Sequence, residues 1–209
     1  MIAVIDYGMG NLRSVQKALE FVGARAVITH DPEVILKADS VVLPGVGAFK
    51  DCMANLEHLK LIEPIRKFID SGKPFLGICL GLQVLFEESE EYGPVAGLGI
   101  LPGKVVKFID GSSDAKNGSL IKIPHMGWNQ IKVKKKSSIF EGVGDAPYFY
   151  FVHSYYVVPE DQNMIATVTN YGVEFVSGIQ HKNIYAFQFH PEKSQTLGLS
   201  ILERFSNLN

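Results

Sequence analysis

Short apolar runs alternate with amphipathic helical stretches through the first ninety residues of the chain. The runs at residues 2–5, 26–28, 41–43 and 75–78 have the composition of strands, and stretches of helical periodicity separate them. This alternation is typical of parallel strands joined by covering helices. We therefore expect an α/β fold with a mostly parallel central sheet flanked by helices.

Capping residues and helix breakers predict where these helices begin and end. Gly23 follows the first helical pattern where a C-cap would lie. Asp31 and Pro32 have the form of an N-cap followed by the first helical residue. A longer helical stretch covers residues 49–69, and we expect a break in it before Pro64.

The second half of the chain has a different texture. After about Gly93, short apolar runs alternate with turn signals, and helical periodicity returns only at residues 196–205. We expect antiparallel additions and edge strands here, packed with the first half into a single domain over residues 1–209. The lysine run at residues 132–136 is interpreted as a solvated strand end, and residues 110–119 as a variable surface loop.

Composition excludes several classes of protein. A formal net charge of −2 and an isoelectric point of about 6.3 lack the basic excess of a sequence-independent nucleic-acid binder. Two cysteines without a CxxC pair or Cys/His cluster argue against a disulfide framework and a metal site. The chain shows no signal-peptide pattern and no apolar run of membrane-spanning length, so we expect a cytoplasmic protein without membrane partners.

Residues 77–81, Gly-Ile-Cys-Leu-Gly, lie where an apolar strand passes into a helical pattern that extends to Phe86. This is the form of a nucleophile elbow, a tight strand-to-helix turn. Small residues two positions either side of Cys79 relieve backbone crowding, and the helix N-terminus favours thiolate over thiol. The alternative is a buried inert cysteine, which is the interpretation we favour for Cys52.

A cysteine nucleophile needs a proton acceptor and a group that orients it. His190 follows the apolar run 186–189, so it should emerge at the same sheet edge as Cys79, where α/β sheets place their sites. Glu192 lies two residues further on and can accept from the second ring nitrogen. None of the other five histidines combines a strand end with such an orienting carboxylate, although a structural histidine remains the alternative at His190.

Acyl transfer also needs hydrogen-bond donors for the developing oxyanion. The loop at residues 44–47, Pro-Gly-Val-Gly, follows the third strand, and its glycines let backbone N–H groups approach a substrate. The N–H of Leu80, directly after the nucleophile, is the second candidate donor. An ordinary strand-to-helix turn that needs a positive φ is the alternative, and both interpretations can hold together. A dinucleotide-binding loop at residues 6–11 is disfavoured because Arg13 stands where a third glycine is required.

Together these residues resemble the class I (triad) glutamine amidotransferases, which have a flavodoxin-like fold. The resemblance extends almost end to end, and it is carried by residues 6–14 (DYGMGNLRS), 44–49 (PGVGAF), 124–129 (PHMGWN), 151–155 (FVHSY) and 189–194 (FHPEKS). It implies hydrolysis of L-glutamine to glutamate and ammonia without a cofactor.

The resemblance also implies a role for each catalytic position. Cys79 would attack the side-chain amide to give a γ-glutamyl thioester. His190 would shuttle the proton to the departing ammonia, and Glu192 would orient His190. The oxyanion would rest on the backbone N–H groups of Val46, Gly47 and Leu80. By analogy with the family, the Val46 peptide would need to reorient before it can donate, which would keep the resting enzyme slow.

The resemblance implies a binding site for the amino-acid head of glutamine as well. Gln83 and Glu91 match the positions that hold this head group, and the backbone at Ser154 and Tyr155 matches the part that holds its carboxylate. The choice of Glu91 over Glu90 rests on the family pattern, because the acidic stretch around them is otherwise typical of a solvated helix end.

In the most similar members of the family, ammonia passes to a separate (β/α)8 cyclase subunit in histidine biosynthesis. The matched motifs are spread from Asp6 to Ser194 of the 209 residues, so we expect the acceptor activity on another chain, in a heterodimer. The positions that match family contact residues are Asn11, Arg13, Trp128, Tyr150 and Lys193. An exposed Trp128 would suit an interface, whereas a buried one would be ordinary core.

Three other functions fit parts of the pattern. A paralogous glutaminase subunit could supply ammonia to another acceptor, such as a surface-sugar amidating enzyme. A cysteine peptidase or deglycase of similar fold would have no ammonium group for Glu91 to bind. A catalytically silent regulatory scaffold would not need Cys79, His190 and Glu192 intact.

Overall fold

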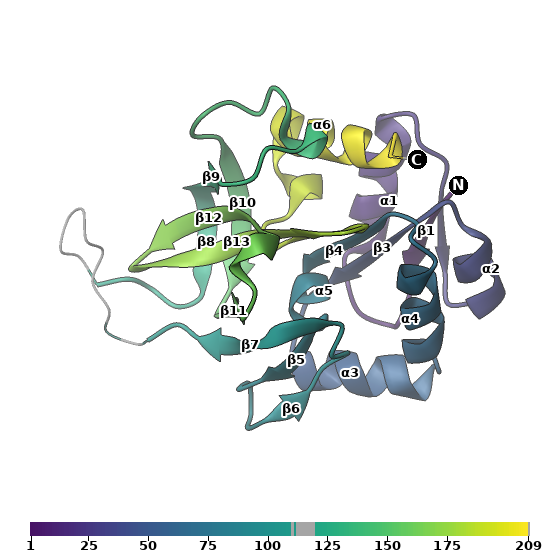
Figure 1. Ribbon diagram of the computed structural model, residues 1–209, viewed down its shortest axis with the longest axis horizontal. Helices are drawn as coiled ribbons and strands as arrows, with labels where there is room; N and C mark the ends of the chain where they lie inside the picture. The colour runs from purple at the N-terminus through teal and green to yellow at the C-terminus, as the bar shows by residue number, and fades with distance from the viewer. Residues whose placement is uncertain (110, 112–119, 209) are drawn as a thin grey trace.

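A computed structural model of the chain describes residues 1–109, 111 and 120–208. Its centre is a twelve-stranded sheet in which five neighbouring strands are parallel, in the order β2-β1-β3-β4-β14 (Figure 1). These strands are β1 (Ile2–Ile5), β2 (Ala26–Thr29), β3 (Ser40–Gly45), β4 (Phe75–Cys79) and β14 (Ile184–Phe187). The expected α/β architecture is confirmed.

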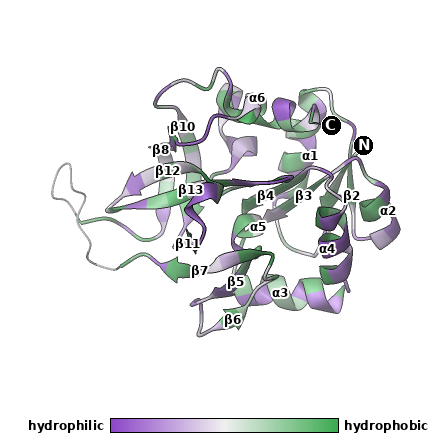
Figure 2. Ribbon diagram, viewed as in Figure 1, coloured by the Kyte–Doolittle hydropathy of each residue, from purple (hydrophilic) through white to green (hydrophobic). Residues whose placement is uncertain are grey.

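Helices cover both faces of these parallel strands (Figure 1). They are α1 (Leu12–Phe21), α2 (Pro32–Lys37), α3 (Phe49–His58), α4 (Ile62–Asp70), α5 (Leu80–Gln83) and α6 (Gln195–Ser206), with short 3-10 turns η1 (Ser138–Phe140), η2 (Gln162–Met164) and η3 (Pro191–Lys193). Side chains of β1 alternate between two buried clusters: Ala3 and Ile5 join residues of α3 and α4, whereas Ile2 and Val4 join residues of α1 and α6. Figure 2 accordingly shows hydrophobic central strands and a hydrophilic outer face on α4.

The expected helix boundaries before Cys79 are confirmed. Gly23 follows α1 with a φ of +85°, a conformation that glycine adopts without strain. The Asp31 carboxylate accepts the N–H of Glu33 at 2.8 Å at the start of α2. The long helical stretch breaks between α3 and α4 at Lys60, so Pro64 lies in the first turn of α4, where a missing N–H costs little.

The second half adds strands to the parallel core, mostly in antiparallel pairs as expected. They are β5 (Phe86–Ser89), β6 (Val95–Ala96), β7 (Leu101–Lys107), β9 (Lys132–Val133), β11 (Tyr155–Pro159), β12 (Ile165–Tyr171) and β13 (Val173–His181), of which β5 and β7 pair in parallel. A separate two-stranded sheet consists of β8 (His125–Gln130) and β10 (Tyr148–His153). The lysine run lies in and after the short strand β9, with Lys132, Lys134 and Lys136 exposed, as predicted.

One expected element is wrong. The helix after Cys79 has only four residues, and Phe86 begins the strand β5 rather than continuing the helix. The backbone carbonyls of residues 84–86 accept N–H groups from residues 98–101, at 2.7 to 3.0 Å, in place of a further helical turn. Tertiary hydrogen bonds have therefore overridden a local helical pattern, and the acidic stretch around Glu90 is not a helix end.

The surface loop predicted at residues 110–119 lies outside the described residues, apart from Gly111. Within the part of the chain that the structure describes, no helix is long and apolar enough to cross a membrane.

Candidate active site

Cys79 occupies a tight turn between β4 and α5, as the elbow pattern predicts. Its φ of 56° and ψ of −108° are unusual for a residue with a side chain. A Cβ atom on Gly77 would lie 2.6 Å from the carbonyl oxygen of Gly81. A Cβ atom on Gly81 would lie 1.9 Å from the carbonyl oxygen of Leu43. Both flanking positions of the elbow therefore require glycine.

Polar groups surround the nearly buried thiol of Cys79. Its Sγ lies 3.8 Å from the carbonyl oxygen of Val152, and Nε2 of Gln188 donates to Sγ at 3.5 Å. Gln188 is fully buried, and its Oε1 accepts from Nε2 of Gln83 at 3.0 Å. The sequence patterns did not predict a role for Gln188, although a polar residue inside an apolar run is a usable signal because it must find buried partners.

His190 and Glu192 lie at the same sheet edge as Cys79. This follows from the parallel pairing of β14 with β4, in which Phe187 lies opposite Ile78. Nδ1 of His190 lies 2.8 Å from Oε1 of Glu192, and both side chains are almost completely buried. Nε2 of His190 has no hydrogen-bond partner among the described residues, so this nitrogen can exchange a proton with a bound molecule.

Burial and nearby negative charge shift the pKa of His190 in opposite directions. Burial lowers its pKa, but the negative charge of the nearby Cys79, followed by the hydrogen bond and charge of Glu192, raises the pKa to about 10. The unfolded chain would have a histidine pKa of about 6.5. A raised folded-state pKa contributes stability that is fully present below the unfolded value and is lost as the pH rises through the folded value.

We therefore expect His190→Gln to be less stable than the wild type at about pH 6, with a difference that shrinks as the pH rises toward about 10. Urea unfolding across this range measures the difference in unfolding free energy. The control is the same comparison in a Cys79→Ala background, where the loss of His190 stabilisation should move to lower pH. A difference in unfolding free energy that grows with pH would contradict a raised pKa of His190 in the folded chain.

A cavity of about 320 Å³ opens beside Cys79. It is lined by Val46, Gly47, Cys79, Leu80, Gln83, Glu91, Pro124, Val152, His153, Ser154 and Tyr155. The structure thus brings together every predicted oxyanion and substrate position. Val152 and His153 were not predicted to have roles, and they lie on the wall because β10 runs past the elbow.

The two predicted head-group residues hold defined positions. Nε2 of Gln83 donates to the carbonyl oxygen of Tyr155 and to Gln188, both at 3.0 Å, which leaves Oε1 of Gln83 to accept from a ligand. Oε2 of Glu91 accepts the N–H of Phe49 at 2.7 Å at the start of α3. Glu90 instead pairs with Lys104 on the surface, so only Glu91 of this pair lies on the cavity wall.

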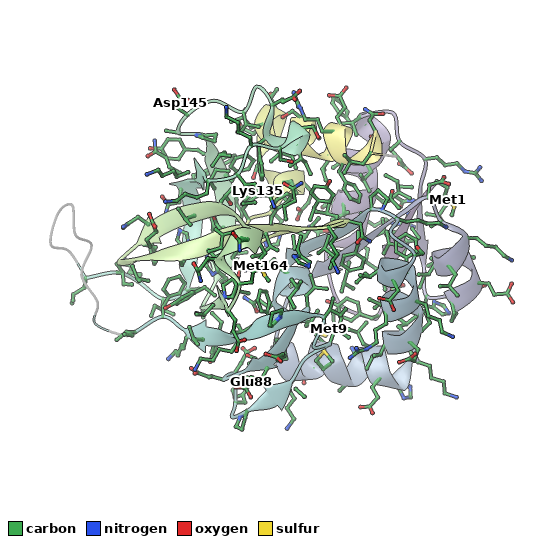
Figure 3. The ribbon with its side chains drawn as sticks, viewed as in Figure 1. Met1, Met9, Glu88, Lys135, Asp145 and Met164 are labelled. Carbon is green, nitrogen blue, oxygen red and sulfur yellow. The ribbon has the colours of Figure 1, made fainter. Side chains whose placement is uncertain are left out.

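The loop after β3 forms one side of the cavity mouth. Val46 is 37% exposed there, and Gly47 has a φ of +95°. A Cβ atom on Gly47 would lie 2.5 Å from Cε of Met9, which Figure 3 shows lying over α3. Glycine at this position therefore satisfies both the backbone conformation and the close approach of a neighbouring side chain.

The five predicted contact residues occupy exposed or half-buried positions. Trp128 is 46% exposed, which decides between the two interpretations of this residue in favour of a surface role. Its ring meets Tyr150 edge-on across the β8–β10 pair, with ring centroids 6.3 Å apart. Nζ of Lys193 lies 5.7 Å from the centroid of the same tyrosine. Asn11 and Arg13 are exposed at the start of α1, which contacts η3.

The remaining candidate groups take ordinary positions. Cys52 is a free thiol buried in the core, as expected, and Cys79 is also free. His30 and His58 are exposed. Among the described residues, no three His, Cys, Asp or Glu side chains gather as a metal ion would require.

Comparison with known proteins identifies the family of this chain. Residues 3–207 match the family model described as glutamine amidotransferase class-I. Imidazole glycerol phosphate synthase subunit HisH of Aquifex aeolicus is 57% identical over 97% of this chain and 94% of its own. The protein of the same name from Geobacter sulfurreducens is 54% identical over 99% of this chain and 98% of its own.

Solved structures show the same fold at lower identity. A crystal structure of a glutamine amidotransferase matches with a TM-score of 0.74 and 16% identity over the whole of both chains. A putative GMP synthase subunit from Thermoplasma acidophilum matches with a TM-score of 0.70 and 23% identity, over 98% of this chain and 91% of its own.

Proposed function

The chain belongs to the class I glutamine amidotransferases, and from this premise we propose that it is the glutaminase subunit of an imidazole glycerol phosphate synthase. In this role it hydrolyses L-glutamine to glutamate and ammonia, and it delivers the ammonia to a (β/α)8 cyclase subunit. The observation that carries the proposal is Cys79 in its strained elbow, beside the His190–Glu192 pair and on the wall of a cavity that fits an amino acid.

The reaction proceeds in two halves. Sγ of Cys79 attacks the side-chain amide carbon of glutamine, and His190 passes the thiol proton to the leaving nitrogen. The C–N bond breaks, ammonia departs, and a γ-glutamyl thioester remains on Cys79. His190 then takes a proton from water, which attacks the thioester and releases glutamate and the free thiol. Glu192 acts by holding the imidazole through its 2.8 Å contact with Nδ1.

The negative charge of each tetrahedral intermediate needs donors outside the triad. The N–H of Leu80 is one, because it directly follows the nucleophile at the start of α5. The N–H groups of Val46 and Gly47 are the others, and each such donor contributes about 3 kcal/mol of transition-state stabilisation. If the Val46 peptide must reorient before its N–H can donate to the oxyanion, this reorientation would limit the rate of the isolated glutaminase.

The cavity wall also supplies groups of the right charge for an α-amino acid. The Glu91 carboxylate and the free Oε1 of Gln83 suit the ammonium group of glutamine. Ser154 and Tyr155 line the same cavity, and their backbone would hold its carboxylate. A peptide backbone or a sugar has no ammonium for Glu91 to bind, which supports glutamine as the substrate.

Measuring glutamate release tests the proposal. The isolated chain should hydrolyse glutamine slowly, and the rate should rise strongly when the cyclase and its phosphorylated ribulosyl substrate are added. No glutamate under any of these conditions would contradict the proposal. Activation by a surface-sugar amidating partner, but not by the cyclase, would favour the paralogous function instead.

Trp128 gives a direct optical test of the partner surface. It is the only tryptophan in the chain and is half exposed, so docking of the cyclase should bury the indole and shift its emission to shorter wavelength. Trp128→Ala should weaken binding by about tenfold or more, because buried tryptophans dominate interface energetics. Phe21→Ala is the matched control, since this exposed aromatic residue lies at the far end of α1. Equal binding by both variants would contradict the assigned surface.

A further inference from the structure

A buried pair of histidines beside the cavity has no part in the reaction steps above. His125 in β8 and His153 at the end of β10 face each other across the two-stranded sheet. Nδ1 of His125 lies 2.8 Å from Nε2 of His153, and the two residues are 3% and 6% exposed. A hydrogen bond between two neutral imidazole rings needs one donor and one acceptor, so each ring must adopt a particular tautomer.

The backbone at one end of the pair fixes these tautomers. Nδ1 of His153 lies 2.9 Å from the carbonyl oxygen of Tyr155, which can only accept. Nδ1 of His153 therefore carries the proton, and its Nε2 is an acceptor. It follows that Nδ1 of His125 donates to His153, and that Nε2 of His125 must itself accept.

The contacts of His125 independently require the same direction of hydrogen-bond donation, from His125 to His153. Nε2 of His125 lies 3.1 Å from Nδ2 of Asn129. The orientation of this amide is set by its other contacts, because Nδ2 donates to the carbonyl oxygen of Asn170 at 3.0 Å and Oδ1 accepts the N–H of Gln130 at 2.8 Å. The amide nitrogen thus donates to His125, in agreement with the assignment from Tyr155.

The environment keeps both rings neutral. Burial lowers the pKa of His125 to about 4, and burial together with the nearby His125 lowers the pKa of His153 to about 3. Aromatic rings enclose the pair, with Phe151 and Tyr171 stacked on His125 and Phe108 tilted against His153. A proton added to either accepting nitrogen would face another donor.

We propose that the hydrogen-bond chain Asn129→His125→His153→Tyr155 is a one-directional positioning relay that holds the substrate-binding backbone of this glutaminase. The Tyr155 carbonyl accepts from His153 on one side and from Gln83 on the other, at 2.9 and 3.0 Å. The relay thus fixes the cavity-lining backbone at Ser154 and Tyr155, where β11 begins. His125 and His153 are positioning residues, since neither is placed to exchange a proton with substrate.

The relay also connects the cavity to the surface assigned to the partner. Asn129 and His125 lie in β8 on either side of Trp128, the exposed aromatic residue of that strand. A partner that shifts β8 would therefore act on the Tyr155 carbonyl through three hydrogen bonds. The kinetic effect of the relay rests on the proposed function. The direction of its hydrogen bonds does not depend on that function.

The first test determines the tautomers without using activity. In the full-length chain labelled with ¹⁵N-histidine, two-bond ¹H–¹⁵N correlation spectra should show both His125 and His153 protonated at Nδ1 and free of titration between about pH 5 and about pH 8. His125→Asn and His153→Asn assign the signals. An Nε2–H tautomer at either residue, or titration of either ring in this range, would overturn the relay.

The second test measures what the relay does. His153→Leu removes the donor to Tyr155, whereas His153→Asn can keep an N–H at the place of Nδ1. In the complex with the cyclase, His153→Leu should raise the KM for glutamine by about tenfold with a much smaller change in kcat, and His153→Asn should recover most of the loss. His153→Leu should also reduce the preference for glutamine over its α-carboxamide analogue, because under the proposed function this backbone holds the α-carboxylate.

A matched control separates positioning from general destabilisation. Thr167→Val breaks another buried side-chain hydrogen bond, the 2.9 Å contact between Thr167 and Ser177, away from the cavity. It should leave both the KM and the substrate preference unchanged. An unchanged preference in His153→Leu, or the same change in Thr167→Val, would overturn the inference. A wild-type complex that releases no glutamate would instead refute the proposed function. The NMR measurement of the two tautomers would then still show whether the hydrogen-bond chain exists.

Discussion

Replacing Cys79 by alanine should abolish glutamine hydrolysis while synthesis driven by added ammonia continues on the cyclase subunit. The nucleophile has no substitute, because Cys52 is buried in the core and forms no part of the cavity wall. Loss of a covalent nucleophile costs on the order of 10⁴-fold or more in turnover. Glutamate release and ammonia-dependent product formation, measured on the same reconstituted complex, give the two rates.

Cys52→Ala is the matched control for this experiment. It removes the other thiol and should leave glutamine turnover intact, and a diazoketone analogue of glutamine should then still alkylate the chain once, at Cys79. Alkylation of Cys79→Ala, or residual glutamine turnover well above background, would contradict the assignment of the nucleophile.

Gly81→Ala should damage both folding and activity. The new methyl group would lie 1.9 Å from the backbone oxygen of Leu43, which is fully buried in the central strand β3 and cannot move aside cheaply. We expect a loss of about 3 kcal/mol or more in unfolding free energy, since overpacking against backbone is among the costliest core changes. Chemical unfolding of the purified chain measures this loss.

Gly72→Ala separates this clash from the ordinary cost of replacing a glycine. Gly72 lies in the turn after α4 with a φ of +80°, and nothing approaches its missing side chain within 4 Å, whereas Gly81 lies in α5 without a positive φ. This control should lose only about 1 kcal/mol, the cost of a left-handed conformation. Equal losses in the two variants would show that the close packing of the elbow against β3 is unimportant.

Local signals in the sequence were sufficient for the parallel core and its helices. Apolar runs, Gly23 and Asp31 each act within a few residues, and the structure confirms all of them. The prediction was wrong beyond Cys79, where the sequence pattern indicated a helix as far as Phe86. Residues 84–86 instead form hydrogen bonds with residues 98–101. These hydrogen bonds join segments that are distant in the sequence, and a pattern of neighbouring residues contains no information about them. The strand β5 therefore could not be predicted.

The candidate site shows the same limit. The elbow glycines and the spacing of His190 and Glu192 are local, and they predicted the arrangement that the structure contains. Gln188 and His153 escaped prediction because their importance comes from partners on other strands, Cys79 of β4 for Gln188 and His125 of β8 for His153. Their one visible signal is polarity within apolar surroundings.

We infer that the ammonia released from glutamine beside Cys79 passes to the cyclase without entering solution. The most direct test supplies the reconstituted complex with glutamine labelled by ¹⁵N at the side-chain amide, in the presence of excess unlabelled ammonium. We predict that the imidazole ring of the product carries ¹⁵N. Product that carries the unlabelled nitrogen of the medium would contradict this claim.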